Sequence, residues 1–495
     1  MLDASGRQEL LAHLKLRFNR WWDTGVGPAV PAFQRADLGY IASQLDAGKA
    51  LTIVGPRQTG KTTLVRQLIN SRLKVQEPET ILYVQFDDRK LLDLTRSPLQ
   101  DVLDVYEEFV LKEKLELTQR PVCLFLDEVQ RLPSWQQVVK DLLAANPKLN
   151  IVATGSSTWL IKQSGQETLP GRQILYELYP LKFREFVALL LHESPVQGKL
   201  DRKLLTGIAR SLREAFRLSA QERDLGIFEK AVHAALFDLA GVAPQLASFA
   251  TKYLRVGGYP EIVQTSDREK CQKLLDGYAK DIVLKDMLPH LRIKNYDVAD
   301  KLLYLLASNS AQKLNIRKLG RALQNSPYQT IMKHLRFYEE VQILSRVPAY
   351  ARSKLRRGKH PKIYFFDNGF RNSLVGTFDI DPSPAEEGLL AEAAVHDHLR
   401  RLVFKVSAVS PARHISYYFS SERKEVDFIV GFPNLGAEIP IEVKFRETVG
   451  QEELKALTEF MERRKPPLGM VVTDKESRRE KNVIFVPLWL FLLLC

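Results

Sequence analysis

The chain has 495 residues, of which 45% are hydrophobic and 26% are charged, and its formal net charge is +13. At roughly 150 residues per domain, this length exceeds one ordinary hydrophobic core and predicts several domains. Cys123, Cys271 and Cys495 lie far apart and show no CxxC or Cys/His spacing. This pattern argues against a disulfide framework or a zinc site and favours a reducing, cytoplasmic setting.

Neither end of the sequence predicts a targeting or membrane-spanning segment. The start, "MLDASGRQELLAHLKLRF", mixes charges with apolar residues at helical spacing and lacks the apolar core of a signal peptide. The end, "VIFVPLWLFLLLC", is shorter than the roughly 20 residues that a membrane helix needs, and it contains Pro487. We expect a buried strand and helix there, with a membrane tail as the less favoured alternative, and no membrane partner.

Changes of pattern along the chain predict an α/β multidomain protein. Residues 1–45 form an N-terminal helical lead, and residues 46–190 alternate short β-rich runs with helical ones, which predicts a parallel-sheet core covered on both faces. Residues 191–300 show helical spacing and are expected to form a helical lid. A basic segment, 301–370, and a mixed α/β segment, 371–495, complete the predicted domains.

The strongest motif is "GPRQTGKTT", which lies between a predicted strand and a predicted helix. Its backbone amides and the positive end of the following helix predict a phosphate-binding loop. Lys61 would contact the β and γ phosphates of ATP, and the Thr62 hydroxyl would ligate Mg²⁺. The predicted binding loop comprises Gly55, Pro56, Arg57, Gln58, Thr59, Gly60, Lys61, Thr62 and Thr63.

Three later segments supply candidate partners for this loop. The run "VCLFLDEVQ" predicts a buried strand that brings Asp127 to Mg²⁺ and Glu128 to the attacking water. The strand "LNIVATGSS" offers Thr154, and secondarily Ser156, to sense the γ-phosphate. Arg172, which follows a glycine, would act on the phosphoryl group in its own chain or in a neighbour, or else be a solvated surface residue.

Basic residues are concentrated between Lys301 and Lys362, where fourteen lysines and arginines face only two glutamates, a local charge of +12. Two predicted helices, a turn and two β-like runs suggest a winged helix-turn-helix that binds DNA. A protein-binding module is the alternative. The predicted DNA contacts are Tyr328, Gln329, Lys333, Arg336, Arg352, Lys354, Arg356, Arg357 and Lys359.

The stretch "KEVDFIVGFPNLGAEIPIEVKF" places Asp427 and Glu442 inside apolar runs and Lys444 two positions later. Buried charges of this kind are costly unless they are paired, and a cation is one such partner. Together with Glu392 from a predicted helix, they reproduce a restriction-nuclease pattern in which Glu392, Asp427 and Glu442 ligate Mg²⁺ or Mn²⁺. Lys444 would stabilise charge or orient water. A degenerate domain that does not cut is the alternative.

The motifs "GPRQTGKTTL", "LFLDEVQRLPSWQQVVKDL", "ATGSS", "LPGR", "ELYPLKFREF" and "YLRVGGYPEIV" occur in this order. Taken together, they resemble a widespread prokaryotic family of AAA-type ATPases over roughly residues 35–495. The resemblance implies an ATPase core followed by a winged helix and a restriction-endonuclease-like domain of the PD-(D/E)XK type.

We therefore expect an ATP- and Mg²⁺-dependent enzyme that couples hydrolysis to movement on, or remodelling of, duplex or branched DNA, with a metal-dependent nuclease tail. A nucleotide-gated regulatory or signalling switch with a non-cutting tail is the alternative. A homo-oligomer is expected, with a ring-forming hexamer among the forms considered.

Overall fold

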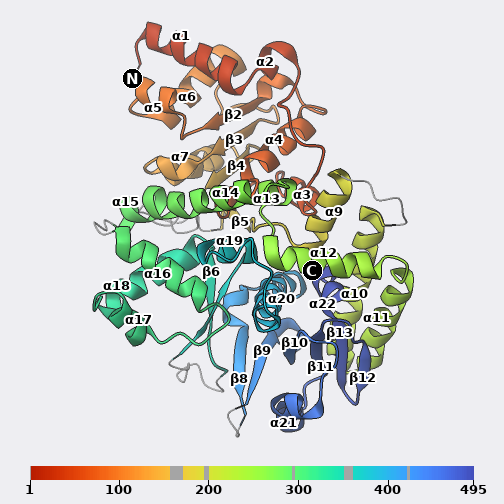
Figure 1. Ribbon diagram of the computed structural model, residues 1–495. Coiled ribbons are helices and arrows are strands. Elements are labelled where there is room, and N and C mark those ends of the chain that lie inside the picture. The colour runs from red at the N-terminus through yellow and green to blue at the C-terminus, as the bar shows by residue number, and fades with distance from the viewer. Residues whose placement is uncertain (1, 156–170, 194–199, 292–295, 351–359, 421–423) are drawn as a thin grey trace. The chain divides into compact units, whose positions relative to one another are not determined.

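The chain divides into two compact units, Met1–Tyr179 and Pro180–Cys495. The computed structural model describes residues 2–155, 171–193, 200–291, 296–350, 360–420 and 424–495 (Figure 1).

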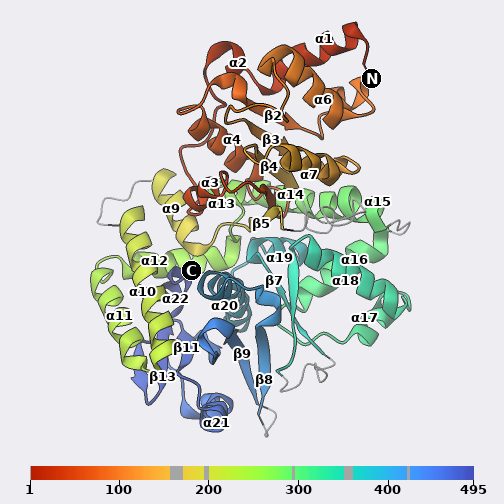
Figure 2. The same cartoon turned by 180° about the vertical axis from the view of Figure 1, so that it is seen from behind.

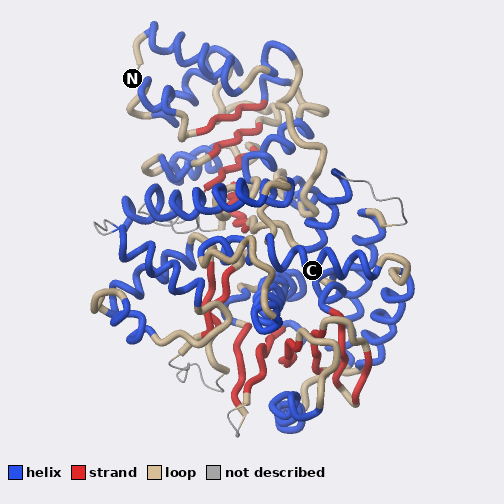
Figure 3. Tube along the Cα trace, viewed as in Figure 1, coloured by secondary structure: helices blue, strands red, loops and turns tan. Residues whose placement is uncertain are grey.

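The first unit is built on a parallel sheet. Its described strands follow the order β2-β3-β4-β1-β5, and every neighbouring pair is parallel. The strands are β1 (Ala50–Val54), β2 (Ile81–Gln85), β3 (Cys123–Asp127), β4 (Asn150–Gly155) and β5 (Gln173–Glu177). The first four are buried along almost their whole length, because helices cover both faces of such a sheet. The predicted parallel-sheet core is confirmed, and Figure 3 shows its strands in red.

Helices connect and cover these strands. They are α1 (Ala4–His13), α2 (Trp21–Thr24), α3 (Leu38–Ser43), α4 (Lys61–Arg72), α5 (Arg89–Leu94), α6 (Pro98–Tyr106) and α7 (Trp135–Ala145). The N-terminal residues are fixed to the sheet by two buried indoles, since Trp21 and Trp22 both donate from Nε1 to the carbonyl oxygen of Ile81, at 3.1 and 2.9 Å. This segment therefore belongs to the core of the first unit.

The second unit begins with helices. They are α9 (Phe183–Glu193), α10 (Arg202–Glu222), α11 (Leu225–Asp238), α12 (Ala243–Val256), α13 (Pro260–Gln264), α14 (Arg268–Asp281) and α15 (Leu288–Leu291). Asp201 and Asp224 cap α10 and α11 by accepting hydrogen bonds from backbone amides of the first turn. α10 packs against a later part of the same unit, where the rings of Phe216 and Phe432 are 5.5 Å apart. The role of the helices between residues 191 and 300 as a lid stays a prediction.

A helical segment with a β-hairpin follows. It comprises α16 (Tyr296–Ser308), α17 (Ile316–Ala322), α18 (Tyr328–Glu340) and the antiparallel strands β6 (Leu344–Val347) and β7 (Lys362–Phe365). Asn315 caps α17 through the amide of Lys318, and Pro327 stands at the N-cap of α18. The order of elements agrees with the helices and strands expected from the sequence.

A mixed sheet forms the rest of the second unit, with the order β12-β13-β11-β10-β9-β8 among the described strands. The strands are β8 (Ile415–Phe419), β9 (Glu425–Phe432), β10 (Ala437–Lys444), β11 (Gly469–Thr473), β12 (Arg478–Glu480) and β13 (Val483–Pro487). Helices α19 (Asn368–Leu374), α20 (Pro384–Ser407), α21 (Lys455–Arg464) and α22 (Leu488–Leu493) accompany it. Figure 2 shows α20 against β9 from behind, and the two elements are in contact.

The apolar C-terminal run forms β13 and α22, both largely buried, as expected. Among the residues that the structure describes, no helix is long and apolar enough to cross a membrane.

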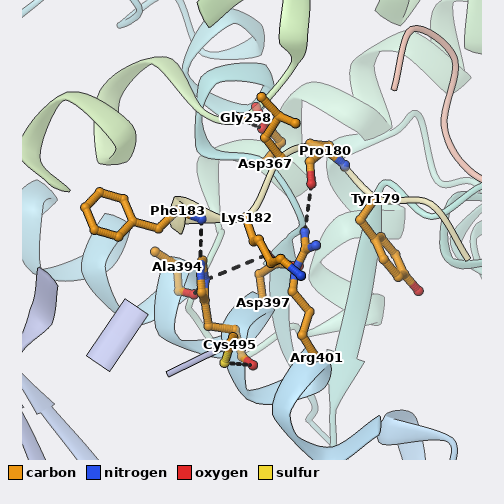
Figure 4. A network of polar contacts seen from close by, with 12 residues as sticks. Tyr179, Pro180, Lys182, Phe183, Gly258, Asp367, Ala394, Asp397, Arg401 and Cys495 are labelled. Carbon is orange, nitrogen blue, oxygen red and sulfur yellow. Dashed lines mark hydrogen bonds and ion pairs between the residues drawn. The ribbon is translucent and has the colours of Figure 1, made fainter. Parts of the chain in front are cut away.

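A buried polar network fixes the beginning of the second unit to α20 (Figure 4). The guanidinium of Arg401 donates to Asp397 at 2.8 Å and to the carbonyl oxygen of Pro180 at 3.0 Å. The backbone N–H of Phe183 donates to Nε2 of His398 at 3.2 Å. Since Nε2 accepts, the ring proton lies on Nδ1, which faces the carbonyl oxygen of Ala394 at 2.8 Å. His398 is therefore neutral here.

Candidate functional sites

The phosphate-binding loop lies between β1 and α4, at the carboxyl edge of the parallel sheet. Gln58 and Gly60 adopt left-handed backbone conformations, with φ of 61° and 91°. A Cβ atom on Gly55 would lie 2.1 Å from the carbonyl oxygen of Leu178, so only glycine fits this close approach. The ammonium group of Lys61 donates to the carbonyl oxygens of Gly55 and Pro56, both at 2.9 Å. Lys61 thus lies folded over the loop that it is predicted to serve.

Asp127 is the polar centre beside this loop. It accepts hydrogen bonds from the hydroxyls of Thr62 at 2.8 Å and Tyr83 at 3.0 Å, and from the hydroxyl of Thr154. Burial raises the pKa of the Asp127 carboxyl, while the hydroxyl of Thr154 acts in the opposite direction. Thr62 and Asp127 together present oxygen ligands of the kind that Mg²⁺ prefers. The residues present fit the predicted magnesium position.

Glu128 follows Asp127 at the end of β3 in a left-handed conformation, with φ of 58°. Its backbone N–H donates to the Thr154 hydroxyl at 3.2 Å, and its carboxyl accepts from the side chain of Gln130. Residues other than glycine seldom adopt this backbone conformation, and such residues are often found at functional positions. Lys61, Thr62, Asp127, Glu128 and Thr154 are thus brought together at one edge of the sheet.

Arg172 lies at the other edge of the same sheet. It precedes β5, whose first residue, Gln173, is in register with Ala50 at the start of β1, whereas the phosphate loop follows Val54 at the end of β1. Five residues of strand span about 15 Å. Arg172 is exposed and donates to the carbonyl oxygen of Lys140 at 3.3 Å. Its predicted action within its own chain therefore conflicts with the strand direction, and its action in a neighbouring chain stays a prediction.

Sequence reasoning missed Arg35. This arginine is 8% exposed and donates to the carbonyl oxygens of Thr59 at 3.2 Å and Tyr179 at 2.9 Å. Arg35 thereby ties the phosphate-binding loop at Thr59 to the backbone of Tyr179. No local pattern in the sequence marks an arginine outside any helix or strand as buried.

The predicted nuclease residues also lie together, in the second unit. Asp427 on β9 and Glu442 on β10 are linked through backbone amides: Asp427 accepts from the N–H of Val443 at 2.9 Å, and Glu442 accepts from the N–H of Asp427 at 3.3 Å. Lys444 pairs with the carboxyl of Glu442. Glu392 comes from α20. The expected convergence of four side chains on one region is thus observed.

Two charged residues that sequence reasoning did not assign to this cluster also enter it. Lys362 on β7 lies 2.8 Å from the carboxyl of Glu392 and 3.5 Å from that of Asp427, and it pairs with Glu425. Glu425 lies two residues before Asp427 on β9, so both side chains lie on one face of the strand. This spacing could have indicated from the sequence that Glu425 belongs to the cluster. Lys362 gave no such signal, because its strand lies far away in sequence.

Burial dominates the electrostatics of this cluster. It raises the pKa of Glu392 to about 7 and that of Glu442 to about 8, and the charge of Asp427 adds to both shifts. Burial alone would lower the pKa of Lys362, but the surrounding carboxylates outweigh it and raise that pKa. Within the described residues, no group of three or more histidine, cysteine, aspartate or glutamate side chains has a geometry that could hold a metal ion. The arrangement therefore does not fit the predicted metal.

The candidate DNA-contacting residues on α18 lie on one exposed face. Tyr328 is 55% exposed, and Gln329, Lys333 and Arg336 are also exposed. Lys333 donates to the carbonyl oxygen of Leu291 at 2.9 Å. The other predicted DNA contacts lie outside the described residues; they are Arg352, Lys354, Arg356, Arg357 and Lys359. Ser156, the second candidate for sensing the γ-phosphate, also lies outside the described residues.

Part of the charge between Lys301 and Lys362 is neutralised inside the molecule. Lys362 enters the carboxylate cluster, and Lys313 pairs with Glu425 at 2.8 Å. The local charge of +12 therefore overstates what this segment presents at the surface, because the neutralising carboxylates of the second unit lie elsewhere in the sequence.

Residues 47–187 match a family model described as "AAA domain". The parallel sheet and the phosphate loop lie in the part of the chain that this model matches, so the first unit is similar to AAA-type P-loop ATPase domains. Residues 249–381 and 387–491 match two further models, each described as a domain of unknown function (DUF8612 and DUF4143).

Two uncharacterized proteins of Methanocaldococcus jannaschii are similar along most of this chain. One is 26% identical over 91% of this chain and 85% of its own length, and the other is 23% identical over 84% and 79%. An uncharacterized protein of Haemophilus influenzae is 25% identical over 66% of this chain and 68% of its own length.

Among solved structures, a Walker-type ATPase of Pyrococcus abyssi is 14% identical and covers 69% of this chain and 95% of its own, with a TM-score of 0.36. AMPPCP-bound DnaA from Aquifex aeolicus is 14% identical and covers 61% and 86%, with a TM-score of 0.25. Both scores are too low to establish a shared fold.

Proposed function

We propose that the protein binds ATP with Mg²⁺ at the phosphate loop of the first unit and hydrolyses it. The observation that carries this proposal is the convergence of Thr62 and Thr154 on Asp127, next to Lys61. This arrangement requires three strands and one loop to end at the same sheet edge, where P-loop proteins place nucleotide phosphates.

Each side chain has a distinct role in this proposal. Lys61 exchanges the carbonyl oxygens of Gly55 and Pro56 for phosphate oxygens when ATP arrives, which costs little because one set of hydrogen-bond acceptors replaces another. Thr62 and Asp127 hold Mg²⁺, which supplies positive charge beside the phosphates. Glu128 positions the attacking water, and Thr154 senses the γ-phosphate.

Two substitutions test these roles. Lys61→Ala should weaken ATP binding and abolish hydrolysis, because the loop loses the cation expected to contact the β and γ phosphates. Glu128→Gln should retain ATP binding but lower kcat by about 10² or more, since general-base or water-orienting groups contribute on that scale. Binding is measured with a fluorescent ATP analogue, and hydrolysis by phosphate release. Wild-type turnover in Glu128→Gln would contradict the assignment.

We further propose that the basic segment expected over residues 301–370, of which the structure describes α16–α18 and β6–β7, is a winged helix that engages duplex or branched DNA through α18. The exposed face that carries Tyr328, Lys333 and Arg336 supports this proposal. ATP hydrolysis would then be coupled to movement on, or remodelling of, the bound DNA. A homo-oligomer, with Arg172 of one subunit acting on the nucleotide of the next, fits the exposed position of Arg172.

The second candidate function is a nucleotide-gated regulatory switch whose tail does not cut. The placement of Lys362 among Glu392, Glu425 and Asp427 favours it, since an ammonium group already balances those carboxylates. Phosphate release and strand cleavage, measured with single-stranded, duplex and junction DNA, separate the two candidates. DNA-stimulated turnover supports the DNA-processing enzyme. Cleavage that Asp427→Ala abolishes would reject the non-cutting tail.

A further inference from the structure

The carboxylate cluster of the second unit encloses an ammonium group. Lys362 is 5% exposed and contacts three carboxylates, from Glu392 on α20 and from Glu425 and Asp427 on β9. A divalent cation would need oxygen ligands at 2.0–2.6 Å around this same point. The ammonium group therefore lies between two of the three carboxylates that were expected to ligate a metal ion, those of Glu392 and Asp427.

Other donors also contact the carboxylates of Glu392 and Asp427. The carboxyl oxygen of Glu392 that contacts Lys362 also accepts from the hydroxyl of Tyr364 at 2.6 Å. The second oxygen of Asp427 accepts from the backbone N–H of Val443 at 2.9 Å. Because carboxylates buried without partners are costly, these donors stabilise the cluster without any metal.

Neighbouring contacts connect the same two parts of the chain. Lys313 pairs with Glu425 at 2.8 Å and lies 3.7 Å from the ring centre of Phe419 on β8. Beyond β6, the backbone forms a parallel bridge between Ala349 and Tyr417, also on β8. The β6–β7 hairpin is thus joined to the edge of the C-terminal sheet by backbone and side chains together.

We propose that Lys362 is the resident cation of this cluster, and that its ammonium group fastens the β6–β7 hairpin to the C-terminal sheet at the position where a metal ion would otherwise bind. The cluster is then a lock between the segments that match DUF8612 and DUF4143. This inference does not depend on ATP hydrolysis in the first unit.

Binding of Mn²⁺ alone tests the proposal on the full chain. Wild type should show no Mn²⁺ binding that depends on Asp427. Lys362→Met should gain one such site, with an affinity for Mn²⁺ at least tenfold above any that wild type shows there, because the carboxylates lose their cation. The double variant Lys362→Met/Asp427→Asn should lose the gained site, which separates it from Mn²⁺ bound at the phosphate loop. The titration is followed by electron paramagnetic resonance of free Mn²⁺.

Two results would overturn the proposal: wild-type binding of Mn²⁺ that Asp427→Asn removes, or no gain of binding in a folded Lys362→Met protein. Lys362→Arg keeps the positive charge and should neither gain the site nor lose much thermal stability. Lys455→Met is the matched control, since Lys455 forms an exposed pair with Glu452 in the same domain. It should change neither Mn²⁺ binding nor Tm.

Thermal unfolding provides a second readout should Lys362→Met fold poorly. Lys362→Met should lower Tm by several degrees, and adding Glu392→Gln should restore part of the loss, because it removes one uncompensated buried carboxylate. A double variant whose Tm falls by the sum of the two single losses would show that the two residues act independently, and the proposed lock would be wrong.

Discussion

At the scale of single residues, the phosphate-binding loop depends on a residue outside its motif. Arg35 reaches the loop from a segment before β1 and binds the carbonyl oxygen of Thr59. A guanidinium has a fixed planar set of donors, so it holds both of its carbonyl partners in one relative position. The loop amides that are to receive phosphate are thereby preorganised.

Replacing Arg35 by methionine should therefore weaken ATP binding. A buried hydrogen bond from a charged group contributes roughly 1.5–3 kcal/mol, which corresponds to about a tenfold or greater increase in Kd. The measurement is equilibrium binding of a fluorescent ATP analogue. Arg89→Met is the control, because the Arg89 side chain is 95% exposed and should leave Kd unchanged. Equal Kd values for wild type and Arg35→Met would show that the loop needs no such support.

His398 predicts a pH dependence of stability. Burial lowers its pKa to about 4 in the folded chain, whereas an unfolded histidine titrates near 6.5. The unfolded state therefore binds the proton first, and stability that is fully present above pH 6.5 falls by about 3 kcal/mol as the pH drops to 4. Burial also raises the pKa of Asp367 to about 6, and its protonation in the folded state acts in the opposite direction.

The contribution of His398 is isolated by substitution. Between pH 7 and pH 4.5, the free energy of unfolding of His398→Gln should fall less than that of wild type, since glutamine cannot gain the proton. Urea denaturation at both pH values measures the difference. His233→Gln, on the exposed surface of α11, is the control and should match wild type. Parallel pH dependences of His398→Gln and wild type would contradict this account.

At the scale of elements, the sequence was most informative where chemistry and local pattern coincide. Lys61, Thr62 and Asp127 could be predicted because short stretches of sequence indicate their structure. A glycine-rich motif predicts the phosphate loop, and an apolar run that ends in an acidic residue predicts the strand. Arg172 was harder to place, because strand direction determines on which edge of the sheet a residue lies. Lys362 could not be placed at all, because its partners come from elements that only the tertiary fold brings together.

The exposed face of α18 carries the prediction for DNA binding. Replacing Lys333 and Arg336 by alanine should weaken binding to all duplex sequences alike, and each lost phosphate contact should reduce the slope of log K against log salt by about 0.9. Fluorescence anisotropy at several salt concentrations measures this slope. Arg217→Gln, in an exposed ion pair on α10, is the control. An unchanged slope in the double alanine variant would move the DNA surface elsewhere.

At the scale of the whole molecule, the division at Tyr179 and Pro180 predicts two separable unfolding events. At 100 times its Kd, Mg·ATP stabilises the unit that binds it by about 2.7 kcal/mol, which is roughly 5–10 °C in Tm for a unit of this size. Scanning calorimetry should show one transition that shifts and one that does not. Lys61→Ala should abolish the shift, while a single transition that moves as a whole would show that the units unfold together.

The attachment of Pro180–Phe183 to α20 has a consequence for synthesis of the chain. The hydrogen bond from Phe183 to His398 cannot form until His398 has been synthesised. The carbonyl oxygen of His398 in turn accepts a hydrogen bond from the thiol of Cys495. At about 5–20 residues per second, a ribosome needs roughly 15–60 s between making the first and the last of these residues. The first unit can complete its sheet during that interval. The first helices of the second unit, in contrast, remain without the later residues against which they pack. Chaperone dependence and aggregation during translation should therefore concentrate in the second unit.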